Sequence, residues 1–172
     1  MKLNTLFCLP FFLLLPSLAF GGVVWNTPPL DKHLADAKKA NSMVVLKFDA
    51  SWCPSCQDLK KEVFQTDAGE KAFEGLIPVV VDFDIPANRI LVERYVVLGL
   101  PTVVVLNAAG KQVGRIAGFE TPADWLSEFS QARKGQGLLT DIAAKFNKSP
   151  TSPKVVLDYG HTLLVNGQIK EG

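Results

Sequence analysis

Cys53 and Cys56, two cysteines three residues apart, are the side chains of this chain best suited to redox chemistry. They follow the apolar run 44–48 (VVLKF), which is typical of a buried strand. They precede residues 57–64, in which apolar side chains recur at the three- to four-residue spacing of a helix. We therefore expect the pair at a strand-to-helix turn, in the first turn of the helix.

That position suits a dithiol redox site. Unpaired backbone N–H groups and the positive end of the helix dipole favour a thiolate on Cys53. Residues three apart are neighbours on a helix, so the two sulfurs can close a disulfide without a large backbone movement. The pattern predicts that Cys53 attacks a substrate disulfide and that Cys56 resolves the mixed disulfide. No bound cofactor is expected, because the dithiol itself carries the electrons.

A C-x-x-C pair also serves other purposes. A zinc site needs four ligands, or three and a water, whereas the chain has only His33 and His161 as histidines and no second C-x-x-C. An inert structural disulfide over so short a loop would constrain the unfolded chain little. A copper-binding or metal-delivery protein that uses the same cysteine pair stays open as the alternative, although both histidines are far from the pair in sequence.

The N-terminus has the pattern of a secretory signal peptide. Lys2 is followed by the apolar run 6–15 and then by small residues. Cleavage after Ala19 and cleavage after Gly21 both fit this pattern. We therefore expect residues 1–21 to be a signal peptide, and the mature protein to be periplasmic or otherwise secreted, where disulfides persist.

Charge and composition limit the expected partners. The chain has 18 basic and 17 acidic residues, a net charge of +1. Loss of residues 1–21 would remove Lys2 and Cys8 but no acidic residue, which leaves 17 of each sign and Cys53 and Cys56 as the remaining thiols. This balance predicts no nucleic-acid partner. The apolar run of the signal is too short to span a bilayer comfortably, so we expect no membrane insertion after signal removal.

The rest of the chain alternates strand-like and helix-like segments. Strands are predicted at 43–49, 76–83, 101–106 and 111–117, and helices at 30–40, 54–64, 87–97 and 122–132, with a short helix after Thr66. Continuous apolar strands indicate an α/β fold whose sheet is covered by helices on both faces. This domain is expected to span residues 22–134.

Residues 135–172 differ in character and are expected to form a C-terminal extension. A short helix is predicted at 138–146, followed by the linker-like stretch 148–153 (KSPTSP). The apolar triplets 155–157 (VVL) and 163–165 (LLV) then predict a hairpin.

Several short motifs resemble the thioredoxin superfamily. They are Phe48-x-Ala50-x-Trp52-Cys53-x-x-Cys56, Gly99-Leu100-Pro101-Thr102 ahead of a strand, Gly110 in a hairpin turn and Gly118-Phe119 before the last helix. The resemblance covers about residues 30–133. Within the superfamily the chain looks most like the C-terminal periplasmic domain of the transmembrane thiol:disulfide interchange reductases. The resemblance implies a thioredoxin-like fold, with a central mixed sheet flanked by helices, and an oxidoreductase that reduces or exchanges protein disulfides.

The resemblance also implies roles for residues near the cysteines. Pro101 would be a cis-proline that faces the disulfide, and the backbone of Leu100 would pair with the substrate chain. We also expect Trp52, Pro54 and Thr102 to contact the substrate. The implied partners are protein disulfide substrates and an upstream thiol electron donor, which a membrane-embedded protein could supply.

One position departs from the family. Many relatives have a buried aspartate six residues before the first cysteine, where this chain has Lys47. A lysine in a core strand is costly unless its ammonium is paired, reaches water or loses its proton. Two interpretations stay open: Lys47 snorkels to water at the strand end, or it supplies a positive field or a base near Cys56. Asp49 and Glu62 are the candidate partners that would tune the pKa values of such a site.

Overall fold

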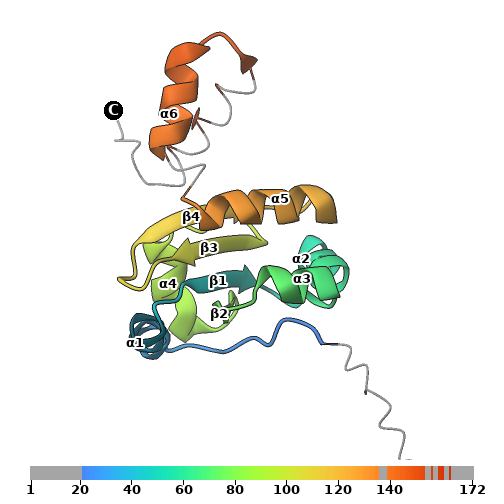
Figure 1. Ribbon diagram of the computed structural model, residues 1–172. Helices are drawn as coiled ribbons and strands as arrows, with labels where there is room; N and C mark the ends of the chain where they lie inside the picture. The colour runs from blue at the N-terminus through green and yellow to red at the C-terminus, as the bar shows by residue number, and fades with distance from the viewer. Residues whose placement is uncertain (1–20, 136–138, 154–155, 157–158, 161–162, 164–172) are drawn as a thin grey trace, which may run out of the picture.

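A four-stranded mixed sheet forms the centre of the molecule (Figure 1). The computed structural model describes residues 21–135, 139–153, 156, 159–160 and 163. The strand order is β2-β1-β3-β4, with β1 parallel to β2 and antiparallel to β3, and β3 antiparallel to β4. The strands are β1 (Val44–Asp49), β2 (Ile77–Asp82), β3 (Thr102–Leu106) and β4 (Gln112–Ala117).

Helices cover both faces of this sheet (Figure 1). One face carries α1 (Leu30–Ala40) and α4 (Arg89–Arg94), which follows the 3-10 turn η2 (Pro86–Asn88). The other face carries α2 (Pro54–Leu59), the π-helical turn η1 (Lys60–Phe64), α3 (Asp67–Ala72) and α5 (Pro122–Arg133). This arrangement confirms the predicted α/β fold with a mixed sheet flanked by helices.

The alternation of side chains along β1 decides which residues lie under the cysteine-bearing helix. Val44, Leu46 and Phe48 pack into the core beneath α1 and α4. Val45 packs on the opposite face, with α2, η1 and α5. Because successive side chains of a strand point to opposite faces, Lys47 lies on the same face as Val45.

The helix ends follow the local sequence signals. The Thr66 hydroxyl accepts the Gly69 N–H at the start of α3, and the Thr121 hydroxyl accepts the Asp124 N–H at the start of α5. Two predicted helices are shorter or divided in the structure. The helix expected at 54–64 becomes π-helical after Leu59, and the one expected at 87–97 ends at Arg94.

The N-terminal segment lies along the outer edge of β2. Asn26 N–H donates to the Pro78 carbonyl over 2.9 Å, and Val80 N–H donates to the Asn26 carbonyl over 2.9 Å. These bonds form an isolated parallel bridge between Asn26 and Val79. The segment therefore covers part of this sheet edge.

The predicted C-terminal hairpin is wrong for the residues that the structure describes. Helix α6 (Leu139–Lys148) confirms the predicted short helix and lies beyond α5, away from the sheet (Figure 1). After a short turn the described residues 153, 156, 159–160 and 163 are also helical, and Val156 N–H donates to the Ser152 carbonyl over 2.9 Å. Residues 156, 159 and 163 are spaced as on one face of a helix, but the apolar triplets also fit the pattern of strands. The other triplet residues, and residues 1–20 of the predicted signal, lie outside the described part.

Candidate active site

Cys53 and Cys56 form a disulfide at the start of α2, as their spacing predicts. Their Cα atoms are 5.3 Å apart. Cys53 is the N-cap residue of α2, and its Sγ accepts the Cys56 backbone N–H over 3.2 Å. In the reduced protein the same N–H would stabilise negative charge on the Cys53 sulfur.

Exposure does not distinguish the two sulfurs, but hydrogen bonding does. Cys53 is 4% exposed and Cys56 is 2% exposed. The Cys56 N–H, in the first helical turn, points to Cys53 Sγ, whereas Cys56 lies within the helix. The geometry therefore favours Cys53 as the thiolate, in agreement with the role that its position predicts.

The Leu100–Pro101 segment lies beside the disulfide. The peptide bond between these residues is cis, as the family resemblance implies. Leu100 is half-buried against the cluster of Ala50, Cys53 and Cys56. The Pro101 carbonyl accepts the Gly118 N–H over 2.8 Å, which ties this segment to the end of β4.

Thr102 lies in a different environment from the other residues expected to contact substrate. Its side chain is 1% exposed, and its hydroxyl donates to the Gly99 carbonyl over 2.7 Å. The Thr102 side chain therefore stabilises the loop before Pro101 from the buried side, through this hydrogen bond. A contact between its side chain and a substrate has no support in this geometry.

Trp52 and Pro54 flank the disulfide at the surface. Trp52 is 62% exposed, and Pro54 is also exposed. The Trp52 indole N–H donates to both carboxylate oxygens of Asp84, over 2.9 and 3.1 Å. Asp84 follows β2 and fixes an otherwise exposed indole next to Cys53. The sequence gives no sign of this partnership, because 32 residues separate the two side chains.

Lys47 is buried and paired. Its ammonium contacts the Asp49 carboxylate, and the two side chains are 5% and 18% exposed. The ammonium also lies 4.9 Å from the centre of the Trp25 ring and 5.3 Å from the centre of the Phe64 ring. The snorkelling interpretation is therefore wrong: the N-terminal segment, through Trp25, covers this lysine.

Of the two candidate partners of Lys47, the structure selects Asp49. Glu62 is exposed on η1, and within the described residues the ion pair of Lys47 is with Asp49. The second carboxylate oxygen of Asp49, Oδ1, is buried and has no hydrogen-bond partner among the described residues. The Lys47–Asp49 ion pair thus leaves one buried carboxylate oxygen, Asp49 Oδ1, without a hydrogen bond among the described residues.

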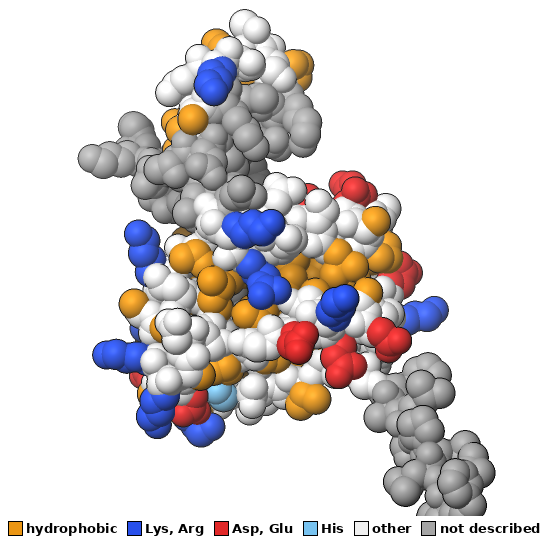
Figure 2. Space-filling view, viewed as in Figure 1, with side chains coloured by type: hydrophobic (Ala, Val, Ile, Leu, Met, Phe, Trp, Pro, Cys, Tyr) orange, Lys and Arg blue, Asp and Glu red, His pale blue; other side chains and the backbone are white. Residues whose placement is uncertain are grey.

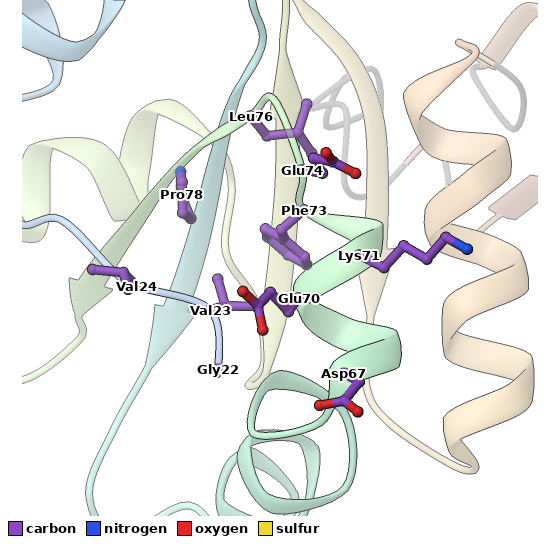
Figure 3. A pocket seen from close by; sticks show the side chains of 10 residues that line it. All are labelled: Gly22, Val23, Val24, Asp67, Glu70, Lys71, Phe73, Glu74, Leu76 and Pro78. Atoms are coloured by element: carbon purple, nitrogen blue, oxygen red, sulfur yellow. The ribbon is translucent and has the colours of Figure 1, made fainter. Parts of the chain in front are cut away.

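The N-terminal segment from Gly22 helps to line two cavities among the described residues, and the cysteines line neither of them. One, of about 500 Å³, is lined by residues 22–24, by α3 and by Pro78, and the side chains of Glu70 and Phe73 are among its lining (Figure 3). Figure 2 shows acidic side chains together on the surface over α3. The second, of about 610 Å³, is lined by Trp25, Lys47 and Asp49 among others. Neither cavity therefore holds the disulfide, whose cysteines are both buried.

The matches to known proteins follow the same part of the chain. Residues 30–133 match the thioredoxin-like domain family. The chain belongs to this family. It is 33% identical over 99 residues to the thiol:disulfide interchange protein DsbD of Pasteurella multocida, and 36% identical over 101 residues to DsbD of Cronobacter sakazakii. These matches cover 54% and 55% of this chain but 17% of each relative, so the chain spans about a sixth of the length of these curated relatives.

Solved structures of the thioredoxin-like family share the fold. A DsbH oxidoreductase superposes with a TM-score of 0.58 at 25% identity, over 78% of this chain and 95% of its own. A thioredoxin from Thermus thermophilus gives 0.54 at 30% identity, over 62% and 85%. The oxidised C-terminal domain of Neisseria meningitidis DsbD gives 0.51 at 23% identity, over 60% and 92%, and supports the fold alone. The chain thus carries the C-x-x-C pair of a thioredoxin-like thiol:disulfide oxidoreductase family.

Proposed function

We propose that this protein is an exported thiol:disulfide oxidoreductase that reduces or exchanges disulfides of protein substrates through Cys53 and Cys56. The observation that carries the proposal is the hydrogen bond from the Cys56 N–H to Cys53 Sγ in the first turn of α2. It supports Cys53 as the attacking sulfur and Cys56 as the resolving one. The exposed side chains of Trp52 and Pro54, next to the buried cysteine pair, support a macromolecular substrate that contacts this surface rather than a small molecule held in a cavity.

The reaction balances as a two-electron exchange. The Cys53 thiolate attacks one sulfur of a substrate disulfide, a Cys53–substrate disulfide forms, and the other substrate sulfur leaves as a thiolate that takes up a proton. Cys56 then loses its proton and attacks Cys53 Sγ. The second substrate thiolate leaves, and the Cys53–Cys56 disulfide forms. The second thiolate also takes up a proton, so the substrate gains two electrons and two protons. The protein loses two electrons and two protons, one from Cys56 in this step and one from Cys53 when its thiolate formed.

Other residues near the disulfide have proposed supporting roles. The backbone of Leu100, before Pro101, would pair with the substrate chain, and Trp52 and Pro54 would contact it at the surface. The Lys47–Asp49 pair would tune the thiol chemistry from the α2 face of β1. The contact of Leu100 with the cysteine pair and the exposure of Trp52 and Pro54 support the first two of these roles.

Export and the upstream partner belong to the same proposal. The signal-peptide pattern of residues 1–21 supports a periplasmic or secreted protein. Within the described residues, no helix has the length and apolar character needed to cross a bilayer. A dithiol in an oxidising compartment stays reduced only if a donor reduces it, so we propose an upstream thiol donor, embedded in the membrane. Similarity to the interchange proteins favours net reduction.

No observation favours the copper alternative. In the described part of the chain, no three His, Cys, Asp or Glu side chains gather as metal ligands. His33 is buried, with Nε2 2.7 Å from the Thr27 carbonyl oxygen. Within the described residues the cysteine pair has no histidine with which it would form such a site, and His161 lies outside them.

The proposal is tested by reduction of a protein disulfide such as those of insulin, with a small dithiol as the electron source. The protein should accelerate the reaction, and Cys53→Ser should abolish the acceleration. The control is the same protein with both thiols alkylated after reduction. A rate equal to that of the small dithiol alone would reject the proposed activity.

A further inference from the structure

Val96 adopts a backbone conformation that its residue type disfavours. Its φ is 46°, and Asn41 is the only other non-glycine residue with a positive φ in the part of the chain described. A β-branched residue is rare in this left-handed region, because Cβ approaches the following carbonyl oxygen. The surrounding structure must therefore hold Val96 in place.

The turn that contains Val96 ends helix α4. The Val97 N–H donates to the Val92 carbonyl over 3.0 Å, and the Val96 N–H donates to the Glu93 carbonyl over 3.1 Å. These two bonds are those of a Schellman motif, in which the left-handed position is usually glycine. Here the position is Val96, so the two hydrogen bonds form although a valine, unlike glycine, resists the left-handed conformation that they require.

Arg115 holds this turn from β4. Its Nη1 donates to the Tyr95 carbonyl over 2.6 Å, and its Nη2 donates to the Val96 carbonyl over 2.8 Å. The planar guanidinium can bind both carbonyl oxygens at once, which a lysine could not do with the same geometry. Burial lowers the pKa of Arg115 to about 10, so the group stays charged at neutral pH.

The turn leads directly to the segment beside the disulfide. Val97 is buried, Leu98 is 69% exposed and Leu100 packs against the cysteine pair. Only three residues separate Val96 from Leu100. The direction in which the chain leaves Val96 therefore sets the positions of both leucines.

We propose that Arg115 is a positioning residue for disulfide exchange. Its guanidinium fixes the Tyr95–Val96 turn and, through it, the segment 97–100 on which a substrate chain binds. The inference rests on the proposed function, because it takes this segment to be part of the substrate-binding surface. Sequence reasoning missed Arg115, since its partners are 19 and 20 residues away.

The test uses the dependence of Arg115 on the residue at position 96. Glycine adopts a positive φ without help, so Val96→Gly should make Arg115 dispensable. Arg115→Gln should raise the KM for a protein disulfide about tenfold, the effect of losing one hydrogen bond to a charged group. Its kcat and the reduction potential of the Cys53–Cys56 pair should not change. Val96→Gly and the double variant should both keep KM within about twofold of the wild type.

Arg133 offers a matched control. Its Nη1 donates to the Ala72 carbonyl over 2.7 Å and joins α5 to α3, away from the segment 97–100. Arg133→Gln removes the same kind of bond and should lower the stability of the fold without changing KM. An unchanged KM in Arg115→Gln would overturn the proposal. A raised KM in the double variant would also overturn the proposal, because the effect of Arg115 on KM would then not depend on the turn at Val96.

Amide hydrogen exchange gives a readout that does not depend on activity. Exchange of the Val97 N–H should accelerate about tenfold in Arg115→Gln and return to the wild-type rate in the double variant. Equal protection in all four proteins would overturn the positioning role even if the wild type reduces disulfides. A wild type that reduces no disulfide would reject the proposed function and leave the exchange experiment to decide the role of Arg115. If Arg115→Gln does not fold, the comparison of Val96→Gly with the double variant still decides, because a higher KM in the double variant contradicts the proposal.

Discussion

Removing the Lys47 ammonium should cost the fold far more than removing the whole Lys47–Asp49 pair. Lys47→Met keeps an unbranched side chain of similar length but leaves the Asp49 carboxylate without its counter-charge. That carboxylate already has one buried oxygen, Oδ1, with no partner among the described residues. Its side chain is only 18% exposed, so water can replace the lost ammonium only in part.

The magnitude follows from burial and from the two rings. Removal of one member of a buried ion pair costs about 3–5 kcal/mol. The contacts of the ammonium with Trp25 and Phe64 add about 1 kcal/mol of attraction that methionine replaces only in part. Because Asp49 keeps some access to water, we expect the lower end, about 3 kcal/mol, for Lys47→Met. Lys47→Met combined with Asp49→Asn should cost about 1 kcal/mol, because no buried charge is left unpaired.

Urea unfolding of the oxidised single and double variants, followed by circular dichroism, measures this difference. The coupling between positions 47 and 49 should be about 2 kcal/mol or more. The exposed pair Lys32–Asp36, whose side chains are 68% and 46% exposed, is the matched control and should give about 0.5 kcal/mol or less. A coupling at 47 and 49 no larger than the control would refute the view that this pair is a buried ionic unit.

Four further predictions follow from the site and the fold. Cys56→Ala should accumulate mixed disulfides with substrates on non-reducing gels and Cys53→Ala should not, whereas equal capture by both would point to a non-catalytic pair. Burial raises the pKa of Tyr95 above its ordinary 10.0, and the charge of Arg94 offsets part of this rise. The neutral phenol is therefore favoured in the folded protein. Its contribution to the free energy of unfolding is complete below pH 10 and is lost as the pH rises through the raised pKa. The ultraviolet titration of the wild type minus that of Tyr95→Phe should therefore show a phenol that ionises above pH 10, and one that ionises at or below pH 10 would contradict this. Gly114→Ala should lower the free energy of unfolding by at least about 2 kcal/mol, because its Cβ would overlap the Ala132 carbonyl oxygen. Gly99→Ala, where nothing lies within 4 Å of the added Cβ, should change the free energy of unfolding by no more than about 0.5 kcal/mol. Truncation after Lys134 should leave a folded protein that still reduces insulin but has lower stability or altered self-association or partner choice, and failure to fold would place the C-terminal extension in the core.

Local signals in the sequence predicted most of the central fold. The strands are continuous apolar runs, and the caps Thr66 and Thr121 lie directly before the helices that they start. The predicted strand-to-helix turn also gave the correct position of Cys53, at the start of α2, because it too depends on local sequence signals. Each of these features depends on a few neighbouring residues, which is the range over which a single sequence is informative.

The features that the sequence did not predict are long-range contacts. Asp84 binds Trp52 across 32 residues, and Arg115 binds the end of α4 across about 20. Trp25 covers Lys47 from a segment that has no periodicity of its own. The apolar triplets of the C-terminal extension were ambiguous in another way, because short apolar runs fit a strand and a buried helix equally well.

The central claim is that Cys53 and Cys56 form a working dithiol in an exported protein. Thiol trapping in intact cells tests it most directly: free thiols are alkylated with a maleimide of high mass before lysis, and the protein is resolved on a non-reducing gel. For a net reductase we predict that the processed protein, shortened by residues 1–19 or 1–21, carries two added labels in the wild type. Cys56→Ala should carry one label where Cys53 is free and none where Cys53 is held in a mixed disulfide. A wild-type protein that takes up no label in cells, but two labels after reduction in the lysate, would contradict the claim that the pair is kept reduced for disulfide exchange.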